Sequence, residues 1–499
     1  MLNRPILISL VGQGVIAALT VALTPLYARL LGLEAFGLLG VYSVVQSCSV
    51  VLEFGLAATL GRETARFSVP GGTTRSVRRL LDHAEIVVAL MAAALSIAMI
   101  VGAGFIVDSW LDLEDLDALS ARRAISCMGV IAGLKLLEML YQSCLIGLQR
   151  QILAVGISTS FALLRGAGAV CVLALFAPTV DAYFHWQIAV SVPQLLVLKV
   201  VVGRLIPRVP NSVSAQSLWS PAVRSFAMGI TGMTLVSVVV AQVDRVILAS
   251  LLPISMLGMF GLMLTLASGL ALLAAPIGQV FQPRLTRCFD AKQEGSFAKE
   301  FHRGAQFIGL MTYSPAALLI MLPNQTLWAW TGRTDFPDEA IWTLRLLSIG
   351  FLMNCMLWMP HQAQIAAGWT KLMLRMSAFC AMIAIPSSIL FIKEFGLPGA
   401  AIGFLLSNSL SLVIAVPVVC KRLFSGQWSR WILGDCVLPL AGALVVGAAG
   451  ATYQAQSRLG SSVMLLALGF LAALASLSLS DQLRPEFIRL IRPRSPGGV

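Results

Sequence analysis

Long apolar runs constrain this chain more than any other feature. Runs of about 20 mostly apolar residues recur throughout the sequence, and each is long enough to cross roughly 30 Å of hydrocarbon as a helix. Hydrophobic residues fill 58% of the 499 positions and charged residues only 12%, about half the charged share of soluble proteins. The apolar–polar alternation of membrane strands is not seen. The sequence therefore predicts an all-α polytopic membrane protein.

Turn-forming residues between the runs divide them into about fourteen predicted transmembrane helices. We expect them near residues 6–28, 36–59, 84–107, 124–148, 152–176, 183–202, 222–251, 257–282, 304–323, 341–366, 373–392, 399–420, 432–453 and 461–479. The span at 183–202 has the weakest pattern, because it contains Pro193.

Basic residues predict the orientation. With both termini in the cytoplasm, the cytoplasmic segments hold about 24 Lys and Arg residues and the opposite side about six, which is a strong positive-inside bias. The net charge of +12 is thus spread over many short loops beside a lipid bilayer. It forms no basic face with interleaved aromatic residues, so we expect no nucleic-acid partner.

Motifs for catalysis are missing. The nine cysteines are scattered, without disulfide or metal spacing. Of the four histidines, His83 and His302 are predicted to lie in cytoplasmic loops, and no pair suits a metal. There is no phosphate-binding loop and no nucleophile elbow. The loops are short, whereas a glycosyl polymerase would show a large outer loop. We therefore expect a membrane transporter without metal or cofactor, and not an enzyme.

One turn motif occurs twice in the sequence. The segment "ARLLGLEAFGLLG" from Ala28 aligns without gaps with "ASLLPISMLGMFG" from Ala249, at an offset of 221 residues. Six predicted spans separate the copies, so both turns lie on the same side of the membrane, as in a parallel repeat. Convergence of two similar hairpins is the alternative, because small residues are common in membrane turns.

The repeat predicts two pseudo-symmetric six-helix lobes and a terminal helix pair. The expected boundaries are an N-terminal lobe at 1–203, a cytoplasmic linker at 204–221, a C-terminal lobe at 222–421, and a terminal pair with a basic tail at 422–499.

Several stretches resemble a known family. "LISLVGQG", "LTPLYARLLGLEAFGLLGVYSVV", "LEFGL", "GRETAR", "QVDRVILASLLPISMLGMF" and "EFGLPGAAIGFLLSNS" are similar to the polysaccharide-transport family, the Wzx-type flippases of O-antigen and exopolysaccharide repeat units. These proteins belong to the same superfamily as MATE multidrug exporters and lipid II flippases. The resemblance runs from Leu7 to about Ser409. It rests on hydrophobic–glycine patterns, which assign the family well and the substrate poorly.

The resemblance implies a V-shaped pair of lobes that alternate between inward-open and outward-open states. The implied substrate is an oligosaccharide on undecaprenyl pyrophosphate, moved from the inner to the outer leaflet of a bacterial inner membrane for O-antigen or exopolysaccharide biosynthesis. A polysaccharide polymerase and a chain-length regulator are candidate partners. Two alternatives remain open. One is a MATE-like, cation-coupled exporter of small amphipathic compounds, although the first span here lacks the acidic residue common in such exporters. The other is a membrane glycosyl polymerase or ligase.

Charges inside predicted spans are the candidate substrate-binding residues, because each is costly in hydrocarbon unless it is functional or paired. Lys135 and Glu138 are three residues apart on one helix face, and Arg165 lies at a similar depth in the next span. Two cations and one carboxylate leave one surplus positive charge near mid-membrane. We expect Arg165 to meet pyrophosphate, because a guanidinium binds phosphate oxygens bidentately. A structural salt bridge between adjacent helices is the alternative.

Three further residues are weaker candidates. Arg62 at the inner end of the second span is placed to receive the head group, or only enforces topology. Gln13 would hydrogen-bond sugars or a neighbouring helix. Glu53 is a candidate coupling residue that takes up a proton, or a partner of Arg62.

The repeated turn also predicts a gate. Arg29 and Glu34 lie within the first copy, and Asp244 and Arg245 lie just before the second. We expect Arg29 to pair with Asp244 when the outer side closes, with Arg245 and Glu34 as a second pair. Near water such a pair is worth about 0–1 kcal/mol, which suits a gate that must open. Pairing within one lobe, or snorkelling of Arg29, is the alternative.

Overall fold

The part of the chain that the structure describes is helical almost throughout. The computed structural model describes residues 4–53, 55–67, 74–206, 221–424, 427–453 and 455–485. No strand occurs in these ranges, which confirms the predicted all-α class. The packing divides the chain into two compact units, Met1–Gly261 (unit 1) and Leu262–Val499 (unit 2), and each is described by itself.

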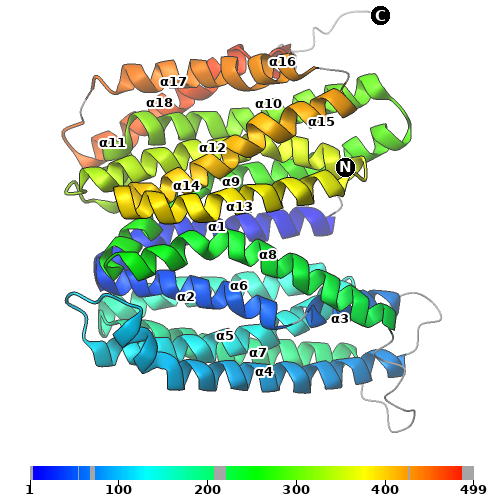
Figure 1. Cartoon of the computed structure of the whole chain (residues 1–499), viewed down its shortest axis with the longest axis vertical. Coiled ribbons are helices and arrows are strands. Elements are labelled where there is room, and N and C mark those ends of the chain that lie inside the picture. The colour runs from blue at the N-terminus through cyan, green and yellow to red at the C-terminus, as the bar shows by residue number, and fades with distance from the viewer. Residues whose placement is uncertain are drawn as a thin grey trace, which may run out of the picture. The chain divides into compact units, whose positions relative to one another are not determined.

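Unit 1 is built from helices, most of them long (Figure 1). Their bounds are α1 Arg4–Leu31, α2 Leu33–Leu52, α3 Leu56–Phe67, α4 Thr74–Ser109, α5 Ala118–Gly147, α6 Gln151–Leu175, α7 Val180–Leu205 and α8 Pro221–Leu251. Helix α5 is central, since it packs against α3, α4 and α7 and also contacts α2 and α6. Because α5 is central, its inward-facing side chains are buried. Leucine, valine and tyrosine side chains of α3, α4, α5 and α7 form one apolar cluster around it.

Unit 2 continues the helical pattern (Figure 1). Helix α9, Ile254–Asp290, begins in unit 1 and continues here. The other elements are α10 Glu294–Met321, α11 Pro323–Thr331, α12 Asp338–Ala366, α13 Thr370–Phe395, α14 Leu397–Leu410, η2 Ser411–Ala415, α15 Val416–Leu423, α16 Trp428–Arg430, η3 Trp431–Val437, α17 Leu438–Gly450 and α18 Arg458–Ser478. The segments η2 and η3 are π-helical, with a wider turn than an α-helix. The last two long helices, α17 and α18, both pack against α10.

The helix lengths agree with a membrane protein. Within the described residues, thirteen helices are long and apolar enough to cross a bilayer. The sequence predicts about fourteen, and the 31-residue α8 coincides with the remaining one.

Three local expectations are corrected. The span predicted at 36–59 ends earlier, because α2 stops at Leu52 and the chain turns at Gly55 with φ +66°, a conformation that favours glycine. The connection between the predicted spans 304–323 and 341–366 contains the short helix α11. His83 and His302, expected in loops, lie within α4 and α10. Both helices begin before the apolar run, since polar residues extend the helix beyond the hydrocarbon-length segment.

The repeated turns meet in unit 1, and they meet symmetrically. A Cβ atom added at Gly37 would lie 2.2 Å from the carbonyl oxygen of Ile254, and one added at Gly258 would lie 2.1 Å from that of Leu33. Gly37 corresponds to Gly258 and Leu33 to Ile254 at the same offset in the repeat. Each copy therefore supplies the glycine that lets the other copy's backbone approach closely. Equivalent contacts between equivalent residues support duplication over convergence.

The four predicted domains remain a prediction. The linker expected at 204–221 and the basic tail after Arg484 fall almost entirely outside the described residues. Helix α8, which the repeat assigns to the second lobe, packs on α2 and α3 and belongs to unit 1. Its contacts with α2 are partly polar, because Gln242 Nε2 donates to Ser47 Oγ at 3.1 Å.

Candidate functional site

Two helices of unit 1 bring the predicted intramembrane charges together. Lys135 and Glu138 lie on α5 and Arg165 lies on α6. The Lys135 ammonium donates to Glu138 Oε2 at 2.6 Å, across the expected three-residue spacing. Glu138 is 1% exposed, so its charge requires a partner, and Lys135 supplies it. The predicted juxtaposition of these three side chains is present in the structure; their role in binding substrate stays a prediction.

Arg165 is only loosely paired with the carboxylate. Its Nη2 lies 3.8 Å from Glu138 Oε1, beyond hydrogen-bond distance. Instead, Nη2 donates to the neutral groups Gln194 Oε1 at 2.7 Å and Ser191 Oγ at 3.3 Å on α7. Since Lys135 neutralises Glu138, the surplus positive charge of the cluster resides on Arg165.

The Arg165 guanidinium also retains binding capacity. Its Nε is buried and has no hydrogen-bond partner among the residues that the structure describes. A guanidinium carries five N–H donors in a planar fork, and an unsatisfied buried donor is costly. A group with acceptor oxygens that reached Nε would therefore gain a charge-assisted hydrogen bond.

A cavity of about 240 Å³ lies beside Arg165. It is lined from α1 by Ile16, Leu19, Thr20, Leu23, Thr24 and Tyr27, from α2 by Tyr42 and Gln46, from α6 by Ala162, Arg165 and Gly166, and from α7 by Tyr183 and Gln187. Tyrosine, threonine and glutamine side chains thus accompany a single charged group. The cavity combines a cation with neutral hydrogen-bonding groups, which is the composition needed for an anionic, hydroxyl-rich ligand.

Aromatic packing fixes one wall of the cavity. The Tyr27 hydroxyl donates to the Gly166 carbonyl at 2.8 Å, joining α1 to α6. The Tyr27 and Tyr183 rings meet edge to face at 5.5 Å between centroids, and the Tyr183 and Phe184 rings do so at 5.2 Å. Such pairs hold rings in defined orientations. The wall is therefore fixed by contacts among α1, α6 and α7.

Other predicted binding residues lie apart from this cluster. Gln13 is exposed on α1, one turn before the cavity-lining Ile16. Arg62 is exposed on α3. Glu53 is 5% exposed and follows the last residue of α2. None of the three lines the Arg165 cavity, and their predicted roles stay predictions.

Two of the predicted gate residues have other partners in unit 1. The Glu34 carboxylate accepts from the backbone N–H groups of Glu114 at 2.7 Å and Asp115 at 2.9 Å, in the connection between α4 and α5. Arg245 Nη1 donates to Ser43 Oγ and Gln242 Oε1, each at 2.9 Å. Arg29 is exposed and Asp244 is half-buried. The gate stays a prediction.

Ser191 and Gln194 were not predicted as site residues from the sequence. Together with Gln187 they form a buried polar stripe on α7, at the spacing of one helix face. The signal was present, but Pro193 made this span look marginal. The structure tolerates Pro193 inside α7 without ending the helix, as happens where neighbouring groups satisfy the freed backbone in a membrane.

Solved structures of membrane transporters share this fold. The lipid II flippase MurJ in an inward closed conformation matches with a TM-score of 0.65 and 12% identity, covering 96% of this chain and 99% of that one. An inward-facing MATE multidrug transporter matches with a TM-score of 0.61 and 12% identity over 85% of this chain and 99% of that one. The MATE multidrug transporter DinF-BH has a TM-score of 0.61 and 15% identity over 85% of this chain and 95% of that one.

These identities establish a shared transporter fold and nothing about cargo. No curated protein sequence matches the chain significantly. The family model described as "Polysaccharide biosynthesis protein" matches residues 2–289, which is more than half of the 499 residues. The fold and the sequence thus agree on a multi-span membrane protein of transporter architecture, and the chain belongs to the polysaccharide biosynthesis protein family.

Proposed function

We propose that this protein is a flippase for a lipid-linked oligosaccharide. Its substrate is an oligosaccharide repeat unit on undecaprenyl pyrophosphate, moved from the inner to the outer leaflet of a bacterial inner membrane by alternating access. Both termini then lie in the cytoplasm, as the distribution of basic residues predicts. The product would supply O-antigen or exopolysaccharide assembly.

The observation that carries the proposal is that the Arg165 guanidinium, beside a polar cavity, has a buried N–H donor without a hydrogen-bond partner among the described residues. A pyrophosphate cannot cross hydrocarbon without groups that replace its water, because the desolvation cost is prohibitive. Arg165 offers its charge and its unpartnered Nε. The lining tyrosine, threonine and glutamine side chains offer hydrogen bonds to sugar hydroxyls.

The cavity size indicates which part of the substrate it holds. Pockets for drug-sized ligands have volumes of about 300–1,000 Å³, and this one has about 240 Å³. It fits a pyrophosphate or a single sugar and is too small for a whole oligosaccharide. We therefore assign the charged head of the substrate to Arg165.

The charge of the site also disfavours a drug-exporter function. Exporters of cationic amphipathic compounds require a surplus negative charge at the binding site, whereas the surplus charge here is positive. A cationic cargo would be repelled by Arg165.

Loss of the gene followed by analysis of lipid-linked intermediates tests the function. We expect the complete lipid-linked repeat unit to accumulate on the inner leaflet, where added periplasmic enzymes cannot reach it. The wild-type gene should restore export. Normal export without the gene would overturn the proposal, and loss of resistance to cationic compounds in its place would favour the exporter alternative.

A further inference from the structure

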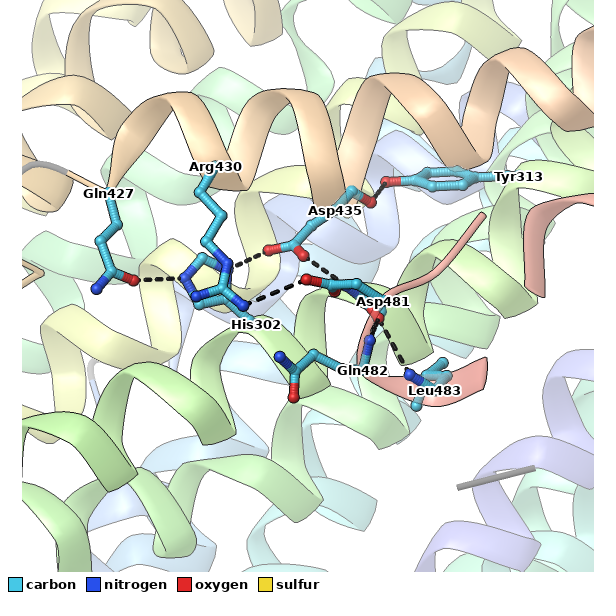
Figure 2. Close-up of polar contacts among 9 residues, drawn as sticks. His302, Tyr313, Gln427, Arg430, Asp435, Asp481, Gln482 and Leu483 are labelled. Carbon is cyan, nitrogen blue, oxygen red and sulfur yellow. Dashed lines mark hydrogen bonds and ion pairs between the residues drawn. The ribbon is translucent and has the colours of Figure 1, made fainter. Parts of the chain in front are cut away.

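A second polar cluster, buried at its centre and exposed at one edge, lies in unit 2. Its side chains come from three segments: α10, the stretch from Gln427 through η3, and the residues after α18 (Figure 2). The members are His302, Gln306, Tyr313, Gln427, Arg430, Asp435 and Asp481. None of them belongs to the motifs that indicate the family, so their chemistry requires its own explanation.

The centre of the cluster is an ion pair between His302 and Asp435. His302 Nδ1 lies 2.5 Å from Asp435 Oδ2, and the two residues are only 2% and 1% exposed. The other ring nitrogen, Nε2, lies 2.9 Å from Gln427 Oε1. Both ring nitrogens thus face oxygen acceptors. Only an imidazolium carries a hydrogen on each nitrogen, so this arrangement matches the protonated ring.

Gln427 can serve either protonation state. Its amide oxygen accepts from the protonated ring as arranged here. If the ring lost the Nε2 proton, the amide would have to turn over and donate its NH₂ group to the bare nitrogen. The amide is therefore a partner that changes its orientation with the proton, while the Asp435 carboxylate continues to accept from Nδ1.

Gln306 connects this pair to the end of the described chain. Its Nε2 donates to Asp435 Oδ1 at 2.7 Å and to Asp481 Oδ1. Its Oε1 accepts from the backbone N–H groups of Gln482 at 2.9 Å and Leu483 at 3.3 Å. The Gln306 side chain thus joins both carboxylates and holds the backbone that follows α18.

The charge balance of the cluster depends on the proton. Asp435 is negative and buried, whereas Asp481 and Arg430 form an exposed ion pair at 3.2 Å. Among the described residues, the other titratable groups close to Asp435 are Tyr313, Cys420 and Cys436, which are ordinarily neutral at physiological pH. A protonated His302 brings the net charge to zero, whereas a neutral His302 leaves one buried negative charge uncompensated.

Asp435 occupies an unusual backbone. It lies in the seven-residue π-helical segment η3, a geometry that is rare and often marks functional positions. Its own carbonyl accepts from the Tyr313 hydroxyl at 3.1 Å. Both the side chain and the backbone of Asp435 are therefore held by α10.

We propose that His302 and Asp435 form a proton-binding site whose occupancy controls how firmly η3 and the segment after α18 dock on α10. The proton sits on Nε2 of His302. When it leaves, Gln427 must reorient, and the uncompensated charge on Asp435 repels Asp481. Gln306, which bonds to both carboxylates, then loses its fixed position, and the N–H groups of Gln482 and Leu483 lose their acceptor. The site shares no residue with the Arg165 cavity.

Hydrogen–deuterium exchange of the purified full-length protein between about pH 5.5 and 9 tests whether the proton on His302 controls the docking of the segment after α18. The rates are corrected for the intrinsic pH dependence of exchange. In the wild type, the amides of Gln482 and Leu483 should lose protection by about tenfold or more as pH rises. His302→Gln removes the titrating group and should make protection independent of pH. His185→Gln is the matched control, because the His185 ring bonds to the Asp181 carbonyl in unit 1.

Nitrogen NMR of ¹⁵N-histidine-labelled protein tests the proton directly. There are four histidines, and the signal that disappears in His302→Gln identifies the ring. At neutral pH we expect both nitrogens of His302 to be protonated. Asp435→Asn keeps the size of the side chain and should return the ring to the neutral form. A neutral ring in the wild type, or pH-dependent protection that persists in His302→Gln, would overturn the proposal.

Discussion

Unit 1 and unit 2 each bury a carboxylate beside cations, and the difference between the two clusters lies in what is left unpaired. Around Glu138, the nearby Arg165 keeps a buried Nε without a hydrogen-bond partner among the described residues and lines a cavity. Around Asp435, the described partners engage both carboxylate oxygens and the backbone carbonyl. An unsatisfied donor beside a cavity can bind a ligand, whereas a satisfied network holds segments together.

The same chemistry therefore serves two purposes. Lys135 neutralises Glu138 and so leaves Arg165 available. In unit 2, the proton on His302 balances the charges of the cluster, whose bonds are used to hold segments together. If this comparison is correct, substitutions in the first cluster should affect transport more than stability, and substitutions in the second should do the opposite.

The largest effect is expected for Arg165→Ala. Transport in cells that lack the wild-type gene should fall by about 100-fold or more, because a charged hydrogen-bonding partner of the substrate is lost. The amount of folded protein should remain near normal. Arg165→Lys should restore only part of the activity, since lysine lacks the planar fork.

Arg122→Ala is the matched control for this prediction. Arg122 lies on the same unit, and its partner is the exposed Asp108 at 2.7 Å. Surface ion pairs contribute little, so transport should be retained. Full activity of Arg165→Ala, with the control also active, would remove Arg165 from the substrate path.

The second largest effect is expected for Asp435→Ala. Removing one partner of a buried ion pair costs about 3–5 kcal/mol, so thermal unfolding in detergent should occur at a clearly lower temperature. Transport per folded molecule should be changed much less than by Arg165→Ala. A stable Asp435→Ala variant with no transport would reverse the roles that we assign to the two clusters.

The glycines of the repeated turn give a smaller effect on unit 1. Gly37→Ala and Gly258→Ala should each destabilise by about 1–3 kcal/mol, because the added methyl group overlaps a backbone oxygen. Gly14→Ala, where nothing lies within 4 Å of the added atom, should be neutral or slightly stabilising through helix propensity. Equal unfolding temperatures for all three variants would show that the close contact does not carry stability.

The smallest effect concerns the predicted gate. An exposed pair between Arg29 and Asp244 would be worth about 0–1 kcal/mol, so single alanine variants should hardly alter stability. Cysteines at the two positions should instead crosslink in the resting, inward-open state, and less so when substrate is present. If they fail to crosslink under every condition, the gate assignment is wrong.

Much of the fold could be predicted because hydrocarbon imposes a simple length rule. The apolar runs indicated nearly all the long helices, and the spacing of Lys135 and Glu138 predicted their ion pair. The ends of the helices were harder to predict. The apolar pattern continues on both sides of Glu53, whereas the turn at Gly55 ends the span. Ser191 and Gln194 beside Arg165 were not predicted, because Pro193 made their span look marginal.

The unit 2 cluster was not predicted at all, because its residues are far apart in the sequence. His302 lies outside the apolar run, and the sequence therefore placed it in a loop, although α10 begins at Glu294. Its partners follow more than 120 residues later, and no local pattern links them. The π-helical turn at Asp435 has no signature that propensity or periodicity can detect.

Transport by the purified protein in liposomes tests the central claim most directly. The probe is an undecaprenyl-pyrophosphate-linked oligosaccharide, supplied in one leaflet, and its arrival in the other is followed with a membrane-impermeant glycosidase. We expect the wild type and Arg122→Ala to move it and Arg165→Ala to leave it in place. A cationic dye should not be transported by any of them. Movement of the lipid-linked oligosaccharide by Arg165→Ala at the wild-type rate would contradict the account.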